Sequence, residues 1–226
     1  MREIKFYKDT VVKAYENDEI TKKEFLSMLH IEKSLLNKRV DKINYRALKV
    51  IDYKPNNGYS MEKIKGKTLS EYFWESRDIE IFLLGVKWLA IFANSFSSKK
   101  IPYLSDYTTH NIMLSGQNDV VVIDQAGALD ELVEVERILS YYLARFSLEL
   151  SLKFKGSKKF LTNAINNYNS IAINKLDLNR LKNEISQSNL RLKKKIKRNL
   201  KGSKKLIIIS LLNLNRLYFN FILLNT

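Results

Sequence analysis

The spacing of apolar residues divides the chain into a strand-rich first part and a mainly helical second part. Alternating and β-branched positions predict two short strands within residues 4–15, with a turn at Lys8-Asp9 between them. Residues 47–53 and 59–64 have the same character, and the Pro-Asn-Asn-Gly segment between them is a strong turn signal. The first part is therefore predicted to be rich in β-structure.

Apolar positions at helical spacing predict one helix within this first part, from Thr21 to about Lys38. Thr21 and Glu24 have the spacing of a capping box at its start. Further along, Thr68 is predicted to cap a helix that begins at Leu69. A strongly apolar helix is expected at 79–95, a hairpin from 112–114 to 120–123, and helix almost throughout from Glu131 onward.

Composition narrows the possible chemistry. The 226-residue chain has no cysteine and only two histidines, so disulfides, thiolate metal sites and cysteine nucleophiles are excluded, and a transition-metal site is disfavoured. The net charge of +15 suggests an anionic partner, although a lysine-rich solvated surface explains it equally well. Residues 1–5 are charged and lack the apolar run of a signal peptide, so an intracellular location is expected.

One short stretch carries the strongest chemical signal. Asp106 and Asn111 stand in a D-x-x-x-x-N loop, and Asp124 follows the β-branched run 120–123. A carboxylate that orients a hydroxyl, with an amide and a second carboxylate that bind Mg²⁺ through oxygen, is the set that phosphoryl transfer needs. Each residue alone can also cap a turn or end a strand. Their order and spacing together favour a phosphotransferase.

The order of these pieces resembles the protein-kinase-like superfamily over about the first 150 residues. Residues 10–13 resemble its lysine strand, 59–69 its hinge and 106–111 its catalytic loop. The resemblance implies a two-lobed α+β fold, with a small β-rich N-lobe that carries one helix at 1–66 and a mainly helical C-lobe at 67–226. It implies an ATP-dependent kinase in the cytoplasm or at the inner face of the membrane.

The same resemblance assigns roles to single residues. Lys13 would contact the nucleotide phosphates, and Glu32 would hold Lys13 in place through an ion pair, with Glu24 as a rival for that role. Asp106 would orient the acceptor hydroxyl or accept its proton. Asn111 and Asp124 would bind Mg²⁺, for which Mn²⁺ can substitute.

The expected second cofactor is ATP, bound at the hinge. The backbone around Glu62 and Ile64 would hydrogen-bond an adenine edge, and Val11 and Met61 would supply apolar surface.

The chain also departs from the family pattern. Leu104 and Ser105 stand where the family often has His followed by Gly or Arg, and Asp124-Gln125-Ala126 replaces Asp-Phe-Gly. No glycine-rich phosphate loop precedes Lys13. These departures keep open an alternative in which a pseudokinase uses the fold to bind a partner protein.

Two branches of the superfamily come into question. The loop at 106–111 resembles the D-L-T-T-S-N loop of small atypical Ser/Thr kinases that act with partner proteins in tRNA threonylcarbamoyl modification. Residues 124–127 resemble the D-x-S-G of lipopolysaccharide core heptose kinases, which phosphorylate a sugar at the membrane surface. The glycine-alanine signature of the first branch is missing before Lys13, which favours the second. The acceptor is accordingly expected to be a sugar, a lipid-linked molecule or a protein.

The C-terminal region is basic and then apolar. Residues 191–205 contain no acid, and residues 206–212 are almost entirely apolar. Such a combination suits an anionic membrane surface, and it would also suit the phosphates of tRNA, as in an RNA-associated ATPase. A terminal helix packed on the large lobe with a solvated lysine collar is the third interpretation.

Overall fold

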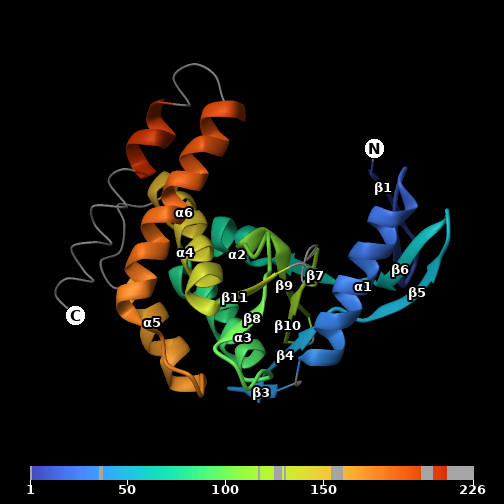
Figure 1. The fold of residues 1–226 in the computed structure, drawn as a ribbon, viewed down its shortest axis with the longest axis horizontal. Coiled ribbons are helices and arrows are strands. Elements are labelled where there is room, and N and C mark those ends of the chain that lie inside the picture. Colours follow the sequence, from blue (N-terminus) through green and yellow to red (C-terminus); the bar gives the residue numbers. More distant parts are fainter. Residues whose placement is uncertain are drawn as a thin grey trace.

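The computed structural model describes residues 2–35, 38–116, 118–124, 129, 131–153, 160–199 and 206–212. It has a β-rich N-terminal part and a helical C-terminal part, as the sequence predicts (Figure 1). Figure 1 shows a first sheet and helix α1 at one end, helices α4 to α6 at the other, and a second sheet between them. Predictions for residues 125–127, 200–205 and 213–226 fall outside the described residues.

Four strands form the first sheet, in the order β1-β2-β6-β5, and each neighbouring pair is antiparallel. Their bounds are Arg2–Phe6 (β1), Thr10–Tyr15 (β2), Val50–Lys54 (β5) and Gly58–Glu62 (β6). Both strands predicted within 4–15 are confirmed. Phe6, Val11 and Met61 stand opposite one another on neighbouring strands. Directly paired residues share a face of the sheet, so these three form one apolar row.

Helix α1 (Asp18–Ser34) packs against this sheet, and it begins earlier than the sequence predicts. Asn17 is the N-cap, and its side chain accepts a hydrogen bond from the Glu19 amide at 2.9 Å. The capping box predicted at Thr21 is therefore wrong. Thr21 is buried, and its hydroxyl accepts a hydrogen bond from the Tyr15 amide at 3.0 Å. This bond ties the end of β2 to the first turns of α1.

The second sheet has five strands in the order β3-β4-β10-β9-β7. Their bounds are Lys38–Val40 (β3), Ile43–Ala47 (β4), Gly66–Thr68 (β7), Ile112–Ser115 (β9) and Asp119–Val122 (β10). The predicted hairpin is confirmed as the antiparallel pair β9–β10. The single strand predicted at 47–53 is instead divided between β4 and β5. Strand β10 is central, and its three valines are buried because both of its faces are covered: Val120 and Val122 belong to the cluster that includes α3, and Val121 belongs to the cluster that includes Met28 of α1.

The helical part begins directly after β7. Its elements are α2 (Leu69–Ser76), η1 (Ile79–Phe82), α3 (Leu83–Ala93), β8 (Lys100–Pro102), η2 (Thr109–Asn111), β11 (Leu132–Glu134), α4 (Val135–Lys153), α5 (Phe160–Ile171) and α6 (Leu178–Asn199). The cap predicted at Thr68 is confirmed as a full capping box with Glu71. Residues 131–134 differ from the predicted helix because β11 pairs with β8. No helix in the described ranges has the length and apolar character needed to cross a membrane.

Helices α3 and α4 approach closely at Gly85. The Tyr107 hydroxyl, from the D-x-x-x-x-N loop, donates a hydrogen bond to the Gly85 carbonyl at 2.5 Å, and the Tyr142 hydroxyl donates to the Phe82 carbonyl at 2.7 Å. Both tyrosines are fully buried. A Cβ atom at Gly85 would lie 2.3 Å from the Tyr142 hydroxyl oxygen. Glycine is therefore required here for close packing.

We predict that Gly85→Ala lowers the free energy of unfolding by about 1–3 kcal/mol, because the added methyl group overpacks a filled core. Urea unfolding followed by circular dichroism measures the change. Gly116→Ala is the matched control: no atom lies within 4 Å of a Cβ added there, so the change should stay within about 0.5 kcal/mol. Equal stability of the two variants would contradict the packing.

Candidate functional site

Lys13 is a buried cation held by two carboxylates. None of its side chain is exposed to solvent. Its Nζ donates to Oε1 of Glu24 on α1 and to Oδ1 of Asp124, which follows β10, the second contact at 2.5 Å. Since a buried charge is stable only when it is paired, Lys13 requires β2, α1 and the end of β10 to meet at one point.

Tyr59 completes this cluster from β6. Its buried hydroxyl donates to Oε1 of Glu24 at 3.2 Å. Burial, together with the neighbouring Glu24 carboxylate, raises the pKa of Tyr59 well above its usual range. The phenol therefore stays neutral and acts as a hydrogen-bond donor that helps to hold Glu24 in place.

The ion pair predicted between Lys13 and Glu32 is not formed. Glu32 lies eight residues beyond Glu24, or about two helical turns, so the two cannot occupy the same position opposite Lys13. Oε2 of Glu32 instead accepts a hydrogen bond from the Val50 amide at 2.8 Å, which ties α1 to the start of β5. Glu24, the rival considered from the sequence, holds Lys13.

The other predicted site residues converge on the same place. The Ile123 amide donates to the Asn111 carbonyl at 2.8 Å, which keeps Asn111 beside the end of β10. The Asn111 side-chain amide donates to the carbonyl oxygen and to Oδ2 of Asp106, both at 3.0 Å. Asp124 has a left-handed backbone with φ of 60°, which is uncommon for any residue except glycine. Asp106, Asn111 and Asp124 thus form one continuous set with Lys13.

Glu149, which was not among the residues predicted from the sequence, holds the loop that carries Asp106. Glu149 on α4 is buried, and its two carboxylate oxygens accept hydrogen bonds from the hydroxyls of Thr109 and Ser70, each at 2.7 Å. Both hydroxyl residues are buried as well. Helices α2 and α4 therefore both hold the loop that carries Asp106. The available signal was an acid within residues 146–152, a helical stretch that otherwise contains only Phe, Leu and Ser.

A cleft of about 250 Å³ opens beside Lys13. It is lined by Ile4, Phe6, Val11, Lys13, Leu48, Met61, Glu62, Lys63, Ile64, Asn111, Met113, Ile123 and Asp124. Lys13, Asn111 and Asp124 form one polar group in this lining, and the row formed by Phe6, Val11 and Met61 is apolar. Glu62 and Lys63 line the cleft as well, next to Met61 in the chain. All five predicted nucleotide-contacting residues line the cleft. The sequence missed Phe6, although the alternation in β1 places it opposite Val11.

The segment after β6 offers one backbone donor to the cleft. The Glu62 amide is bonded to the Lys49 carbonyl and the Lys63 amide to the Asp9 carbonyl, both at 3.0 Å. Within the described residues, the Ile64 amide has no hydrogen-bond partner. The Glu62 carboxylate is also engaged, by Arg46 at 2.5 Å and by the Lys49 amide at 2.7 Å. A ligand edge can therefore bond to the Ile64 amide but not to the Glu62 amide.

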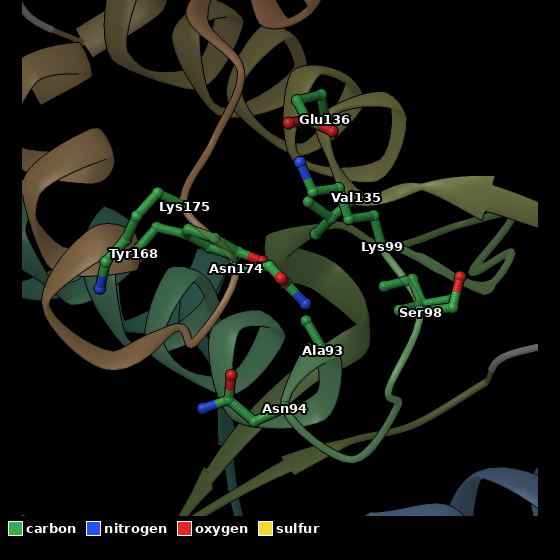
Figure 2. Close-up of a pocket in the computed structure, with 10 residues that line it drawn as sticks. Ala93, Asn94, Ser98, Lys99, Val135, Glu136, Tyr168, Asn174 and Lys175 are labelled. Carbon is green, nitrogen blue, oxygen red and sulfur yellow. The ribbon is translucent and has the colours of Figure 1, made fainter.

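A second hollow lies where the end of α3, the start of α4 and the segment after α5 meet (Figure 2). Its volume is about 10 Å³, which is the room of a single water molecule. The polar groups around it bond to the protein: Glu136 accepts from the Asp177 amide at 2.7 Å, and the Asn94 side chain donates to the Ile171 carbonyl at 3.0 Å. This hollow is a structural junction.

The basic C-terminal region is folded against α4. Leu192 of α6 and Leu212 of the helical segment 206–212 are buried in one cluster with Leu148. Around this cluster the charges face solvent: the exposed residues are Lys194, Lys195, Lys197 and Arg198. Leu206 and Ile207 are also exposed, by 69% and 55%. The packed helix expected for this region is present, and it carries exposed apolar residues that a simple lysine collar would lack.

Comparison with known proteins adds no family to this picture. The sequence matches none of the protein-family models, and a search of curated proteins finds no relative. The geometry of the site must therefore carry the functional argument.

We predict that Lys13→Met destabilises the protein by about 3–5 kcal/mol, because Glu24 is left as an unpaired buried charge. Adding Glu24→Gln to that variant should recover part of the loss, since the buried charge is then removed. Urea unfolding of the two single variants and the double variant gives the coupling free energy. The matched control is Glu32→Gln, which should show no coupling to Lys13→Met. Coupling to Glu32 instead of Glu24 would refute the observed pairing.

Proposed function

We propose that the chain is an ATP-dependent phosphotransferase with a protein-kinase-like, two-lobed fold, which transfers the γ-phosphoryl group of ATP to a hydroxyl. The observation that carries this proposal is Lys13, held between Glu24 and Asp124 in the wall of a cleft that also presents an apolar row. In this proposal residues 1–66 are the N-lobe and the remaining chain is the C-lobe. The order of two strands, a helix, further strands and then helices supports this assignment.

The cleft suits a nucleotide along its length. The purine base would lie against the apolar row of Phe6, Val11 and Met61, and its edge would accept a hydrogen bond from the Ile64 amide. The phosphates would then reach Lys13. A lysine ammonium is a strongly hydrated point charge that commonly binds phosphate oxygens.

The oxygen atoms beside Lys13 fit Mg²⁺. The Asn111 side chain donates through its nitrogen to Asp106, so its carbonyl oxygen can bind a metal, and the Asp124 carboxylate lines the same cleft. Among the described residues no group of three or more His, Cys, Asp or Glu side chains converges. One amide and one carboxylate suffice here, because Mg²⁺ is usually bound by few protein ligands together with substrate phosphates. The bound metal would neutralise charge on the phosphate oxygens.

In this proposal Asp106 acts on the acceptor. Its side chain is exposed, and the hydrogen bond from Asn111 fixes its orientation. In the proposed step, the acceptor oxygen forms a bond to the γ-phosphorus while the bond from that phosphorus to the β–γ bridging oxygen breaks. The hydroxyl proton passes to Asp106 and ADP leaves. The chain contributes mainly position and charge, which is what phosphoryl transfer demands of a protein.

We predict that the full chain transfers phosphate from Mg²⁺–ATP and that Asp106→Asn and Asp124→Asn each lower kcat by about 100-fold or more. Asparagine keeps the size of both side chains and tolerates the left-handed backbone at position 124. A radiolabelled-ATP assay against sugar, glycolipid and protein acceptors measures the rate. Asp52→Asn is the matched control, because Asp52 is exposed on β5 and does not line the cleft.

Equal rates in the wild type, Asp106→Asn and Asp124→Asn would refute the proposed kinase. If the wild type binds ATP but transfers no phosphate to any acceptor, the alternative of a pseudokinase adaptor is favoured instead.

For the C-terminal region we propose an anionic membrane surface as the partner. The exposed lysines at the end of α6 adjoin the exposed Leu206 and Ile207. Lysines alone would suit lipid or tRNA phosphates equally, but exposed aliphatic side chains gain free energy only by entering an apolar phase. A kinase bound there would meet a lipid-linked sugar at the surface, which agrees with the branch of the superfamily that the sequence favours.

We predict that vesicles containing phosphatidylglycerol bind the full chain, and that neutral phosphatidylcholine vesicles bind it much less. Replacing Lys194, Lys195 and Lys197 with Gln should weaken the free energy of vesicle binding by about 1 kcal/mol per lysine. A vesicle co-sedimentation assay measures this loss. The matched control replaces Lys22, Lys33 and Lys49, which are exposed on the other part of the molecule.

A second variant, Leu206→Ser with Ile207→Ser, separates lipid from RNA. It should weaken vesicle binding and leave any salt-dependent tRNA binding unchanged. If the protein binds tRNA through the three lysines and does not bind vesicles, the partner of the C-terminal region is RNA and the membrane proposal is refuted.

A further inference from the structure

One face of α4 runs alongside the loop that carries Asp106. Its partly exposed residues between 136 and 150 recur every fourth position, as Arg137, Tyr141 and Arg145. At the first of them, the Arg137 guanidinium lies 4.6 Å from the centre of the Tyr103 ring. One turn beyond the last, Glu149 accepts a hydrogen bond from Thr109. The loop and the helix therefore run in the same direction, and Arg145 falls opposite the loop between Tyr103 and Thr109.

Tyr141 confirms this alignment halfway along. Burial raises its pKa, the Arg145 guanidinium opposes that shift, and the Asp106 carboxylate and Tyr103 add to it. The phenol thus lies within electrostatic reach of both Arg145 and Asp106. Along α4, Arg137, Tyr141 and Glu149 thus lie near Tyr103, Asp106 and Thr109 in that order, and Arg145 lies between Tyr141 and Glu149.

Arg145 lacks a partner in this position. Among the described residues it forms no ion pair, and its Nε atom is buried without a hydrogen-bond acceptor. Its natural partner would be Glu149, one turn further on, but the hydroxyls of Thr109 and Ser70 occupy both carboxylate oxygens of Glu149. The Nε atom of Arg137, two turns earlier on the same face, is buried without an acceptor as well, but its guanidinium is paired with Glu131 at 2.6 Å. Of the two arginines on this face, Arg145 is thus the one without a carboxylate partner among the described residues.

We propose that Arg145 binds an anionic group, a phosphate or a carboxylate, on the acceptor molecule, next to the hydroxyl that Asp106 orients. This inference rests on the proposed phosphotransferase and names its substrate class: a hydroxylated acceptor that is itself negatively charged. A guanidinium is suited to the task because its donors bind both oxygens of such a group at once. Arg145 does not line the nucleotide cleft, so the acceptor rather than ATP is its ligand.

The test is a calorimetric titration of the full chain with glucose 6-phosphate, glucuronate and methyl glucoside as probes. We expect the two anions to bind more tightly than the neutral sugar. Arg145→Met should lower the affinity for the more tightly bound anion by about tenfold or more, and it should leave the affinity for methyl glucoside unchanged. Comparing glucose 6-phosphate with glucuronate separates a phosphate from a carboxylate site. Arg137→Met is the matched control on the same helix face, and it should bind all three probes like the wild type.

Two results would overturn the anion site: wild-type protein that does not distinguish the anions from methyl glucoside, or Arg145→Met that binds them unchanged. If thermal unfolding shows that Arg145→Met is poorly folded, the titration is repeated with Arg145→Lys. Lysine keeps the positive charge but cannot bind both oxygens of the anion in bidentate fashion, so an anion affinity between those of the wild type and Arg145→Met is expected. The titration involves no phosphoryl transfer. Loss of the proposed kinase activity with intact Arg145-dependent binding would therefore refute the function alone.

Discussion

The buried ammonium of Lys13 is the constraint on which the structure depends. Removing a charge from water costs several kcal/mol unless carboxylates compensate it, so Lys13 cannot be buried without Glu24 and Asp124. Those three residues come from a strand of the first sheet, from α1, and from the end of the central strand of the second sheet. The pairing therefore fixes how the two sheets meet. It also places the Lys13 ammonium and the Asp124 carboxylate side by side in the lining of the cleft.

The loop beside this cluster is held by buried polar contacts from the helical part. The Tyr107 hydroxyl bonds to α3, and Thr109 bonds through Glu149 to α4, which bonds in turn to Ser70 on α2. Breaking a buried hydrogen bond of this kind is costly, because the polar groups lose their partner and no water replaces it. The same contacts that stabilise the helical core thus set the position of Asp106 relative to Lys13.

Much of the site could be predicted from the sequence because the positions of its residues follow from neighbouring segments of the chain. The hairpin β9–β10 necessarily brings Asn111 near Asp124, and β-alternation places Val11 and Lys13 on one face. The choice between Glu24 and Glu32 could not be made in this way. It depends on where along α1 the helix crosses β2, which tertiary packing decides. Glu149 was missed because its partners lie 40 and 79 residues away.

The double attachment of Lys63 has a consequence for motion. Its amide donates to the Asp9 carbonyl and its ammonium donates to the Tyr7 carbonyl, each at 3.0 Å. The turn between β1 and β2 is thereby fastened to the segment that leads into the second sheet. This turn cannot lift as an independent flap without breaking both bonds. Any motion of the first sheet would therefore carry this turn and residues 63–65 together as one unit.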